Sequence, residues 1–354
     1  MIRTITIVSL SAGTIGEPFV KHELDLGVRR LEDLGLRVKF SAHALMGREY
    51  LKNHPEKRAE DLLAAFRDPE TDLILCAIGG DDTYRLAPWL FEHGELAAAL
   101  RSKPFLGFSD TTVNHLMLHK LGLPTFYGQS FLADLCELDR DMLPYTRRYF
   151  EELIQTGTIR AVTPSPVWYE ERTHWGPDQV GVPRVSHPNT GFELLQGPPV
   201  FEGKLLGGCI ESLYDLLTGS RYGDEAEICE KYGLFPDAED WKGRILLLES
   251  SEEKPGPALY EKALRLLKDR GILGAVSGVL LGKPMDGTFE AEYKEAILRV
   301  AGELRTADGR PLPILANLSV GHATPRCILP FGVLARVDAE KQIIEFGPQP
   351  KPSP

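Results

Sequence analysis

The stretch PFLGFSDTTVNHLMLHKLG, from Pro104 to Gly122, predicts a buried strand that turns sharply into a helix. Its first five residues form an apolar run of the length of a buried strand. Between Val113 and Leu121, apolar side chains recur at the spacing of one helix face, and Gly122 predicts the end of that helix.

Ser109 stands at the apex of this predicted turn, and two interpretations of it are open. A serine at a strand-to-helix turn projects its hydroxyl away from the sheet, and the N–H groups of the first helical turn point toward whatever the hydroxyl attacks. Nucleophile elbows of acyl-transfer enzymes use this arrangement. The alternative is that Ser109 or Asp110 only caps the helix, since both residue types are favoured there.

Strands and helices alternate along residues 1–163, which predicts a parallel sheet covered on both faces. In such a sheet a site forms at the carboxyl ends of the strands. We expect strands at 2–10, 36–40, 73–78, 104–108 and 123–127, and helices at 19–34, 58–66, 84–90, 111–121 and 142–156.

A second candidate turn, GGDDT from Gly79 to Thr83, also follows a predicted strand. Adjacent glycines permit close backbone approach and leave N–H groups free, as an oxyanion site requires. The alternative is a tight turn into a helix that is capped by Asp81 or Asp82.

Composition changes from Pro164 to Pro199, where prolines are frequent and no period is sustained. We therefore expect a first domain at 1–163, an interdomain connection at 164–202 and a second domain at 203–354. The connection contains Trp168 and Trp175. These aromatic side chains either stack on a planar ligand group or fill the domain boundary.

The second half contains the remaining candidate residues. We expect a glycine turn and a helix within 203–219, a helix at 258–269, and strands at 241–249, 275–281, 313–320, 328–337 and 342–346. Glu249 ends one of these strands and His322 follows another, as Ser109 follows a strand in the first half. A hydroxyl, an imidazole base and a carboxylate that orients the imidazole are the groups that serine hydrolysis requires. Whether the three side chains meet is not decided by the sequence.

The whole chain of 354 residues carries a net charge of −11, which argues against a broad nucleic-acid or anionic-membrane surface. Five cysteines are scattered without CxxC spacing, which indicates free thiols in a reducing compartment. There is no signal-peptide pattern and no apolar run of about 18 residues. We therefore expect a cytoplasmic protein.

Metal and cofactor motifs are weak. His115 and His119 have the spacing of a zinc pair, but no glutamate lies between them, so ordinary helix histidines are favoured. Gly13 and Gly16 do not form a GxGxxG fingerprint, and no GxxxxGK[ST] loop occurs. We expect a metal-free enzyme without a cofactor.

Several motifs in order resemble the LD-carboxypeptidase family of serine peptidases, which includes muramoyltetrapeptide carboxypeptidases and the self-immunity peptidases that inactivate microcin C. The resemblance covers nearly the whole chain. It rests on AIGGDDTYRLAPWL, PFLGFSDTT, LPTFYGQS, KLLGGCIESLYDLLTG, RILLLESSEE and GHATPRCILPFG.

This resemblance implies that Ser109 is the nucleophile, that His322 is the general base and then the acid, and that Glu249 orients His322. It implies an oxyanion hole formed by backbone N–H groups near Gly80 and Asp110. It also implies a Rossmann-like N-terminal domain, a smaller mixed, β-rich C-terminal domain, an active site at their interface, and a metal-free homodimer.

Two features bear on the substrate. Cys209 stands where many relatives have asparagine, which places any binding role of that side chain in doubt. The loop with Trp168 and Trp175 looks like the microcin immunity branch, where loop aromatics stack on a nucleotide base. The tryptophan loop and the GGDDT turn, with Gly79 and Asp81 as further substrate contacts, favour an aminoacyl or peptidyl adenylate over a murein tetrapeptide. The hypothesis from another class is a non-catalytic ligand-binding protein that retains the fold.

Overall fold

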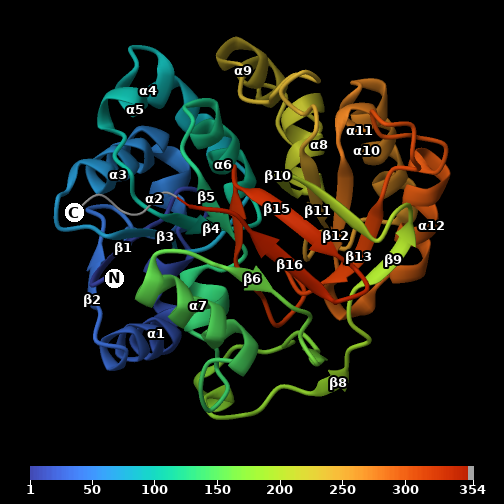
Figure 1. Ribbon diagram of the computed structural model, residues 1–354. Helices are drawn as coiled ribbons and strands as arrows, with labels where there is room; N and C mark the ends of the chain where they lie inside the picture. The colour runs from blue at the N-terminus through green and yellow to red at the C-terminus, as the bar shows by residue number, and fades with distance from the viewer. Residues whose placement is uncertain (350–354) are drawn as a thin grey trace.

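The first half of the chain contributes five strands, and the second half one, β14, to a six-stranded sheet of the order β14-β5-β4-β3-β1-β2. The computed structural model describes residues 1–349 (Figure 1). All neighbours in this sheet are parallel except β14, which runs antiparallel to β5. The strands are β1 (Thr4–Val8), β2 (Arg37–Phe40), β3 (Leu73–Cys76), β4 (Phe105–Gly107), β5 (Thr125–Tyr127) and β14 (Leu329–Phe331).

A larger mixed sheet of the order β6-β16-β15-β10-β11-β12-β13-β9 forms the second half (Figure 1). Strands β10 to β13 are parallel, and antiparallel strands flank them on both sides. The strands are β6 (Ala161–Val162), β9 (Glu193–Gln196), β10 (Val200–Cys209), β11 (Ile245–Glu249), β12 (Gly278–Gly282), β13 (Ile314–Leu318), β15 (Leu334–Asp338) and β16 (Ile343–Phe346). The two sheets confirm the expected fold class, a parallel-sheet N-terminal part and a mixed, β-rich C-terminal part.

The helices pack against both sheets. In the first half they are η1 (Thr14–Gly16), η2 (Pro18–Val20), α1 (Lys21–Asp33), α2 (Arg48–Asn53), α3 (Pro55–Arg67), η3 (Thr83–Leu86), α4 (Ala87–Phe91), α5 (Glu95–Ala99), α6 (Thr111–Lys120), η4 (Phe131–Leu135) and α7 (Pro144–Thr156). Further along the chain they are η5 (Pro177–Gln179), α8 (Ile210–Thr218), α9 (Glu225–Tyr232), α10 (Pro257–Asp269), α11 (Ile272–Ala275), η6 (Met285–Gly287) and α12 (Glu290–Ala301). No helix within residues 1–349 is long and apolar enough to cross a membrane.

Helix α6 lies between the two halves, where it contacts α8 and β10. Its residues from Thr111 to Leu118 are all buried, so the helix has no exposed face over this length. A helix that is covered on all sides belongs to the core. The prediction of a single apolar face on this helix is therefore incomplete, because two sheets cover it.

The expected glycine turn within residues 203–219 is wrong, because Gly207 and Gly208 lie inside strand β10. Their φ angles of 142° and 139° belong to a region that favours glycine. A Cβ atom on Gly208 would lie 2.3 Å from the hydroxyl oxygen of Thr112 in α6. The glycines therefore allow the strand to pass close to the first half.

The single strand predicted for residues 328–337 is also wrong. Gly332 separates β14, which pairs with β5 in the first sheet, from β15, which pairs with β10 in the second. The chain thus adds a strand to the first sheet before it adds β15 and β16 to the second sheet. The proposed boundaries at 163/164 and 202/203 stay a prediction.

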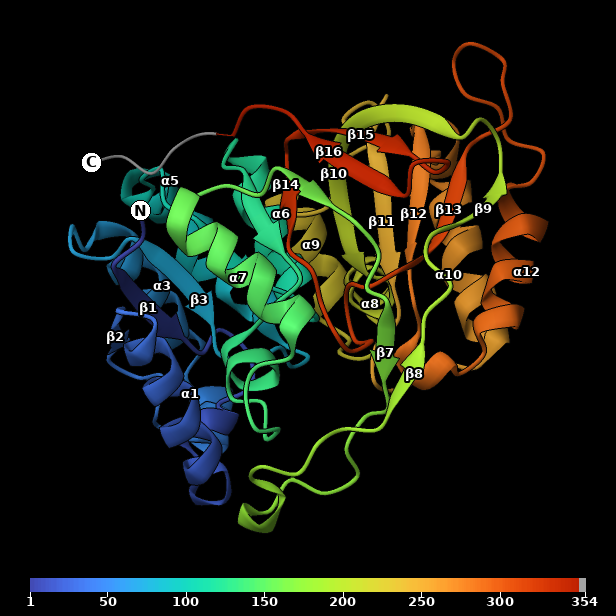
Figure 2. The ribbon, with the colours of Figure 1, turned by 60° about the horizontal axis from the view of Figure 1, so that its bottom comes forward.

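The proline-rich connection contains a two-stranded sheet of β7 (Val167–Tyr169) and β8 (Ser186–Pro188), in addition to strand β9. Figure 2 shows that the segment between β7 and β8 extends away from both main sheets. It returns to the first half, where the backbone carbonyl of Trp175 lies 2.9 Å from His22 Nε2. This contact places the tryptophan loop beside helix α1.

Candidate active site

Ser109 occupies a strained turn between β4 and α6. Its φ angle is 67°, in the left-handed region that residues other than glycine rarely adopt and that is common at functional sites. The interpretation of this serine as a helix cap is wrong, because no side chain caps the start of α6. Asp110 does not cap it either, since its carboxylate accepts a hydrogen bond from the N–H of Thr83 at 2.9 Å.

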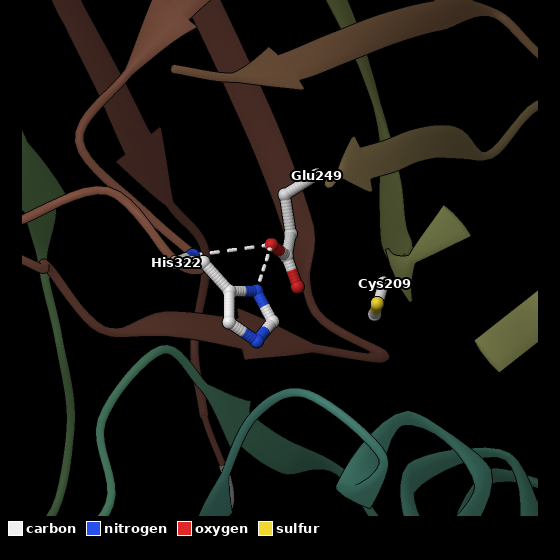
Figure 3. Close-up of side chains that lie close together, drawn as sticks. All are labelled: Cys209, Glu249 and His322. Carbon is white, nitrogen blue, oxygen red and sulfur yellow. Dashed lines mark hydrogen bonds and ion pairs between the residues drawn. The ribbon is translucent and has the colours of Figure 1, made fainter. Parts of the chain in front are cut away.

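His322 joins Ser109 to Glu249, although the three residues are far apart in the sequence. Its Nε2 atom lies 3.0 Å from the Ser109 hydroxyl oxygen, and its Nδ1 atom lies 2.7 Å from Glu249 Oε2. The backbone N–H of His322 donates to the same carboxylate oxygen at 3.1 Å, as Figure 3 shows. The predicted trio is thus brought together at the junction of the two sheets, with the geometry of a nucleophile, a base and an orienting acid.

Tyr127, at the end of β5, supports this arrangement and was not predicted. Its hydroxyl donates to Glu249 Oε1 at 2.6 Å and accepts from the N–H of Ser109 at 3.3 Å. Burial and the adjacent Glu249 carboxylate raise the pKa of Tyr127 well above its usual range, so the hydroxyl remains a donor. The sequence signal for this residue was only its place in the motif LPTFYGQS.

The electrostatics of His322 depend on two carboxylates. Burial alone would lower its pKa, but Glu249 on one side and Glu252 on the other raise it to about 10. Glu252 Oε2 lies 2.9 Å from His322 Nε2, the nitrogen that also faces Ser109. The hydrogen bond to His322 lowers the pKa of Glu252 to about 2. Both carboxylates therefore favour the protonated imidazole. The sequence signal for Glu252 was only its place in the motif RILLLESSEE.

The predicted oxyanion residues, Gly80 and Asp110, follow Gly79 and Ser109 directly in the chain, and Gly80 lines the same cavity as Ser109. A Cβ atom on Gly79 would lie 2.6 Å from the Ser109 hydroxyl oxygen, so any larger residue at position 79 would displace the serine side chain. Within residues 1–349, the N–H groups of Gly80 and Asp110 donate no hydrogen bond to another residue. Free backbone N–H groups beside a nucleophile can stabilise a developing oxyanion.

The capping alternative for the GGDDT turn is wrong as well. Asp82 precedes η3 but makes no side-chain cap there. Its carboxylate instead forms an ion pair with the buried Arg58 at 2.5 Å. Asp81 is exposed, and its backbone N–H donates to Ser11 at 3.0 Å.

A cavity of about 1440 Å³ opens on the side of Ser109 that faces η1, η2 and the tryptophan loop. Gly79, Gly80, Ser109, His322 and Trp175 all line it. Trp175 is 47% exposed, so its indole is available to a ligand. The volume exceeds that of an ordinary small-molecule pocket.

Trp168 lies outside this cavity. Its ring stacks on His187 with a centroid distance of 4.4 Å, and the Nζ atom of Lys283 lies 5.4 Å from its centroid. Of the two tryptophans predicted to contact substrate, the structure therefore brings only Trp175 to the site. The other supports the small β7–β8 sheet.

Arg48 is a further residue that sequence reasoning missed. Most basic side chains that line the cavity have carboxylate partners, as Lys254 has in Asp286 at 2.7 Å. In the part of the chain that the structure describes, the Arg48 guanidinium has no ion pair or hydrogen bond. It is therefore available to an anionic group of a ligand.

Within residues 1–349, one group of side chains has the spacing of a metal site, and it includes two of the three candidate catalytic residues. The ligand atoms of Cys209, Glu249 and His322 lie within 4.8 Å of one another, and Figure 3 shows Glu249 between the other two. The carboxylate already binds the imidazole, and burial raises the pKa of the Cys209 thiol well above its usual range. His115, which has zinc-pair spacing with His119, is an ordinary buried histidine, because Thr125 Oγ1 and the Gly107 carbonyl lie within hydrogen-bond distance of its two ring nitrogens.

Comparisons with known proteins point to the same family in both halves of the chain. The family models of the LD-carboxypeptidase N-terminal and C-terminal domains match residues 5–128 and 202–337. The structure is similar to the crystal structure of an MccF-like protein from Streptococcus pneumoniae in complex with AMP. The two are 61% identical, with a TM-score of 0.94 over 98% of this chain and 99% of that one.

Two curated relatives are more distant. A murein tetrapeptide carboxypeptidase of Pseudomonas aeruginosa is 35% identical over 90% of this chain and 89% of its own length. The microcin C7 self-immunity protein MccF of Escherichia coli is 26% identical over 93% of this chain and 89% of its own length.

Proposed function

The chain belongs to the LD-carboxypeptidase family of serine-type carboxypeptidases, and we propose that it hydrolyses an amide bond of an aminoacyl or peptidyl nucleotide through Ser109, His322 and Glu249. The observation that carries this proposal is the continuous contact from the Ser109 hydroxyl through the imidazole to the buried carboxylate. The non-catalytic alternative would be expected to lack at least one of these groups, and all three are in contact.

The reaction follows from this geometry. Ser109 Oγ attacks the amide carbonyl carbon while its proton passes to His322 Nε2, and the Glu249 carboxylate stabilises the imidazolium through Nδ1. The oxyanion accepts hydrogen bonds from the N–H groups of Gly80 and Asp110. The carbon–nitrogen bond then breaks, and the leaving nitrogen takes the proton from Nε2. Water attacks the acyl-enzyme with His322 as base, which releases the carboxylic acid and restores the serine hydroxyl.

The first step requires a neutral imidazole, which the free site does not favour. With the pKa of His322 at about 10, Nε2 carries a proton at neutral pH and bonds to Glu252. Substrate that occupies the space beside Ser109 separates this pair, since Glu252 lines the same cavity. The loss of the carboxylate contact lowers the pKa of the imidazole and makes it a base.

The large cavity suits a nucleotide leaving group. Trp175 offers an aromatic face for a base, and the Arg48 guanidinium is free to bind a phosphate. The similar S. pneumoniae protein is in complex with AMP, which supports the same ligand class for this chain. The second candidate substrate is a murein tetrapeptide, which the relationship to the P. aeruginosa enzyme favours. The homodimer and the cytoplasmic location stay predictions.

Hydrolysis of two substrates, followed by mass spectrometry, tests the proposal. One is an amide-linked aminoacyl adenylate, and the other is a muropeptide that ends in D-alanine. Wild type, Ser109→Ala and the exposed control Ser186→Ala are compared. We expect wild type and the control to cleave the adenylate, and Ser109→Ala to lose at least about a thousandfold in rate.

Each other outcome has a definite meaning. Cleavage of the tetrapeptide alone would identify a murein carboxypeptidase. Binding of either compound without cleavage by wild type would support the ligand-binding protein. Full activity in Ser109→Ala would show that the assignment of the nucleophile is wrong.

A further inference from the structure

A second, much smaller pocket lies on the other side of Ser109 from the large cavity. It has a volume of about 30 Å³, enough for one group of the size of water or ammonium. Its walls include residues of α8, the first residue of α9 and the loop after β11. Gly80, Ser109 and Glu252 line both spaces, so the nucleophile stands between them. A substrate bound at Ser109 can therefore extend into both.

The small pocket is strongly acidic. More than half of its lining residues are Asp or Glu, and Arg221 is the one basic side chain among those that the structure describes. The Arg221 guanidinium is already engaged by Asp215 at 2.9 Å and by Glu253 at 2.7 Å. It also lies 4.0 Å from Asp81. Asp110, Glu211 and Glu225 have no ion-pair partner among the described residues that line the pocket.

Among the carboxylates of this pocket, Glu225 lacks a partner most clearly. The residue is 2% exposed, and within the described chain its Oε2 atom has no hydrogen-bond partner. Leaving a buried carboxylate oxygen without a partner is costly. Burial, then the charges of Asp215 and Asp110, raise the pKa of Glu225 to about 8. A cation that enters the pocket would lower this pKa and give the unpartnered carboxylate oxygen a partner.

Neither stabilisation of helix α9 nor a metal site explains why Glu225 is buried without a partner. The residue lies in the first turn of α9, where an acidic side chain can stabilise the helix, but its Oε2 atom receives no N–H group. A metal ion would need several ligand atoms in convergence. In residues 1–349 the one such group is Cys209, Glu249 and His322, which does not include Glu225. An ammonium group needs no such convergence, because it presents three separate donors.

We propose that this pocket binds a primary ammonium group on the acyl residue of the substrate, with Glu225 as its counter-ion. The inference rests on the proposed function, because attack by Ser109 defines which part of the substrate is the acyl group. The leaving group then occupies the large cavity, and the acyl residue directs its cationic group to the acidic side. Two parts of an amino acid can supply that group: a free α-ammonium, or the end of a lysine-type side chain.

Three amide-linked adenylates distinguish these sources. The norleucyl compound carries only the α-ammonium, the Nα-acetyl-lysyl compound only the side-chain ammonium, and the Nα-acetyl-norleucyl compound neither. The value of kcat/KM is measured for each with wild type, Glu225→Gln and Glu227→Gln. Glu227 lies on the same helix but is exposed, so its variant controls for the loss of charge.

We expect wild type to prefer one charged compound over the uncharged one by about tenfold or more, since a hydrogen bond to a charged group contributes that much. Glu225→Gln should reduce this ratio toward one, whereas Glu227→Gln should keep it. The charged compound whose advantage disappears identifies the source of the ammonium.

Cleavage of the three compounds at equal rates by wild type would overturn the inference and leave the proposed function standing. A preference that Glu225→Gln retains would also overturn it. Cleavage of none of them would refute the proposed function, and this inference with it. Because the wild-type ratio is measured on the unaltered protein, the proposal can be refuted even if Glu225→Gln does not fold.

Discussion

Replacing Glu252 with glutamine should shift the pH dependence of hydrolysis to lower pH. His322 acts as a base only in its neutral form, and the Glu252 carboxylate at 2.9 Å from Nε2 favours the charged form. The pKa of His322 is raised to about 10, so kcat/KM in wild type should still increase with pH through the alkaline range. Glutamine has nearly the same shape without the charge, so it should lower this pKa and keep the imidazole neutral at lower pH.

The size of the shift follows from the exposure of the pair. The Glu252 side chain is 62% exposed, so solvent screens its attraction to the imidazolium. Pairs of this kind contribute about 0.2–1 kcal/mol, and one pKa unit corresponds to about 1.4 kcal/mol. Because His322 is buried, we take the upper part of that range and expect the rising limb to move by roughly 0.5–0.7 pH unit. Below the limb, kcat/KM should then increase about three- to fivefold.

The assay is a pH profile of kcat/KM between the acid and alkaline limits of stability, with the aminoacyl adenylate as substrate. Glu253→Gln is the matched control, because that carboxylate is the next residue and binds Arg221 instead of His322. A limb that stays in place in Glu252→Gln, or moves to higher pH, would refute the argument that Glu252 holds the proton on His322. An equal shift in both variants would show that the effect is general and does not come from the direct contact.

Two further substitutions test the support of the site. Gly79→Ala should reduce kcat/KM about a hundredfold, because the added Cβ would lie 2.5 Å from Ser109 Cβ and displace the nucleophile. The control is Gly274→Ala, which should leave kcat/KM unchanged because no atom lies within 4 Å of its added Cβ. Tyr127→Phe removes the bond to Glu249 and should lower the free energy of unfolding by about 1.5–3 kcal/mol in urea denaturation. An unaltered denaturation midpoint in Tyr127→Phe would contradict the prediction for that variant.

The local elements of the chain were predictable from the sequence. The strand and helix around Ser109 were expected at 104–108 and 111–121, and the structure places them at Phe105–Gly107 and Thr111–Lys120. The helix expected at 258–269 is Pro257–Asp269. Periods of apolar residues, glycine stops and strand ends are local signals, because neighbouring residues alone determine them.

Elements whose partners are distant in the sequence were predicted less well. The pair Gly207–Gly208 indicates a turn when only its neighbours are considered. In the structure both glycines pair with strand β11, and Gly208 lies close to Thr112. Residues 328–337 form one apolar run, and its division between two sheets depends on partners about 130 to 200 positions earlier.

The sequence by itself determined which chemical groups the site offers. It also placed Ser109, Glu249 and His322 at the ends of strands. Only the tertiary structure decided that Ser109, Glu249 and His322 meet, that Tyr127 and Glu252 accompany them, and that Glu225 lies buried without a partner. The physical reason is that hydrogen bonding, desolvation and charge interaction depend on distance in space. Those distances are fixed when the two sheets pack against each other around α6, and no pattern along the chain records them.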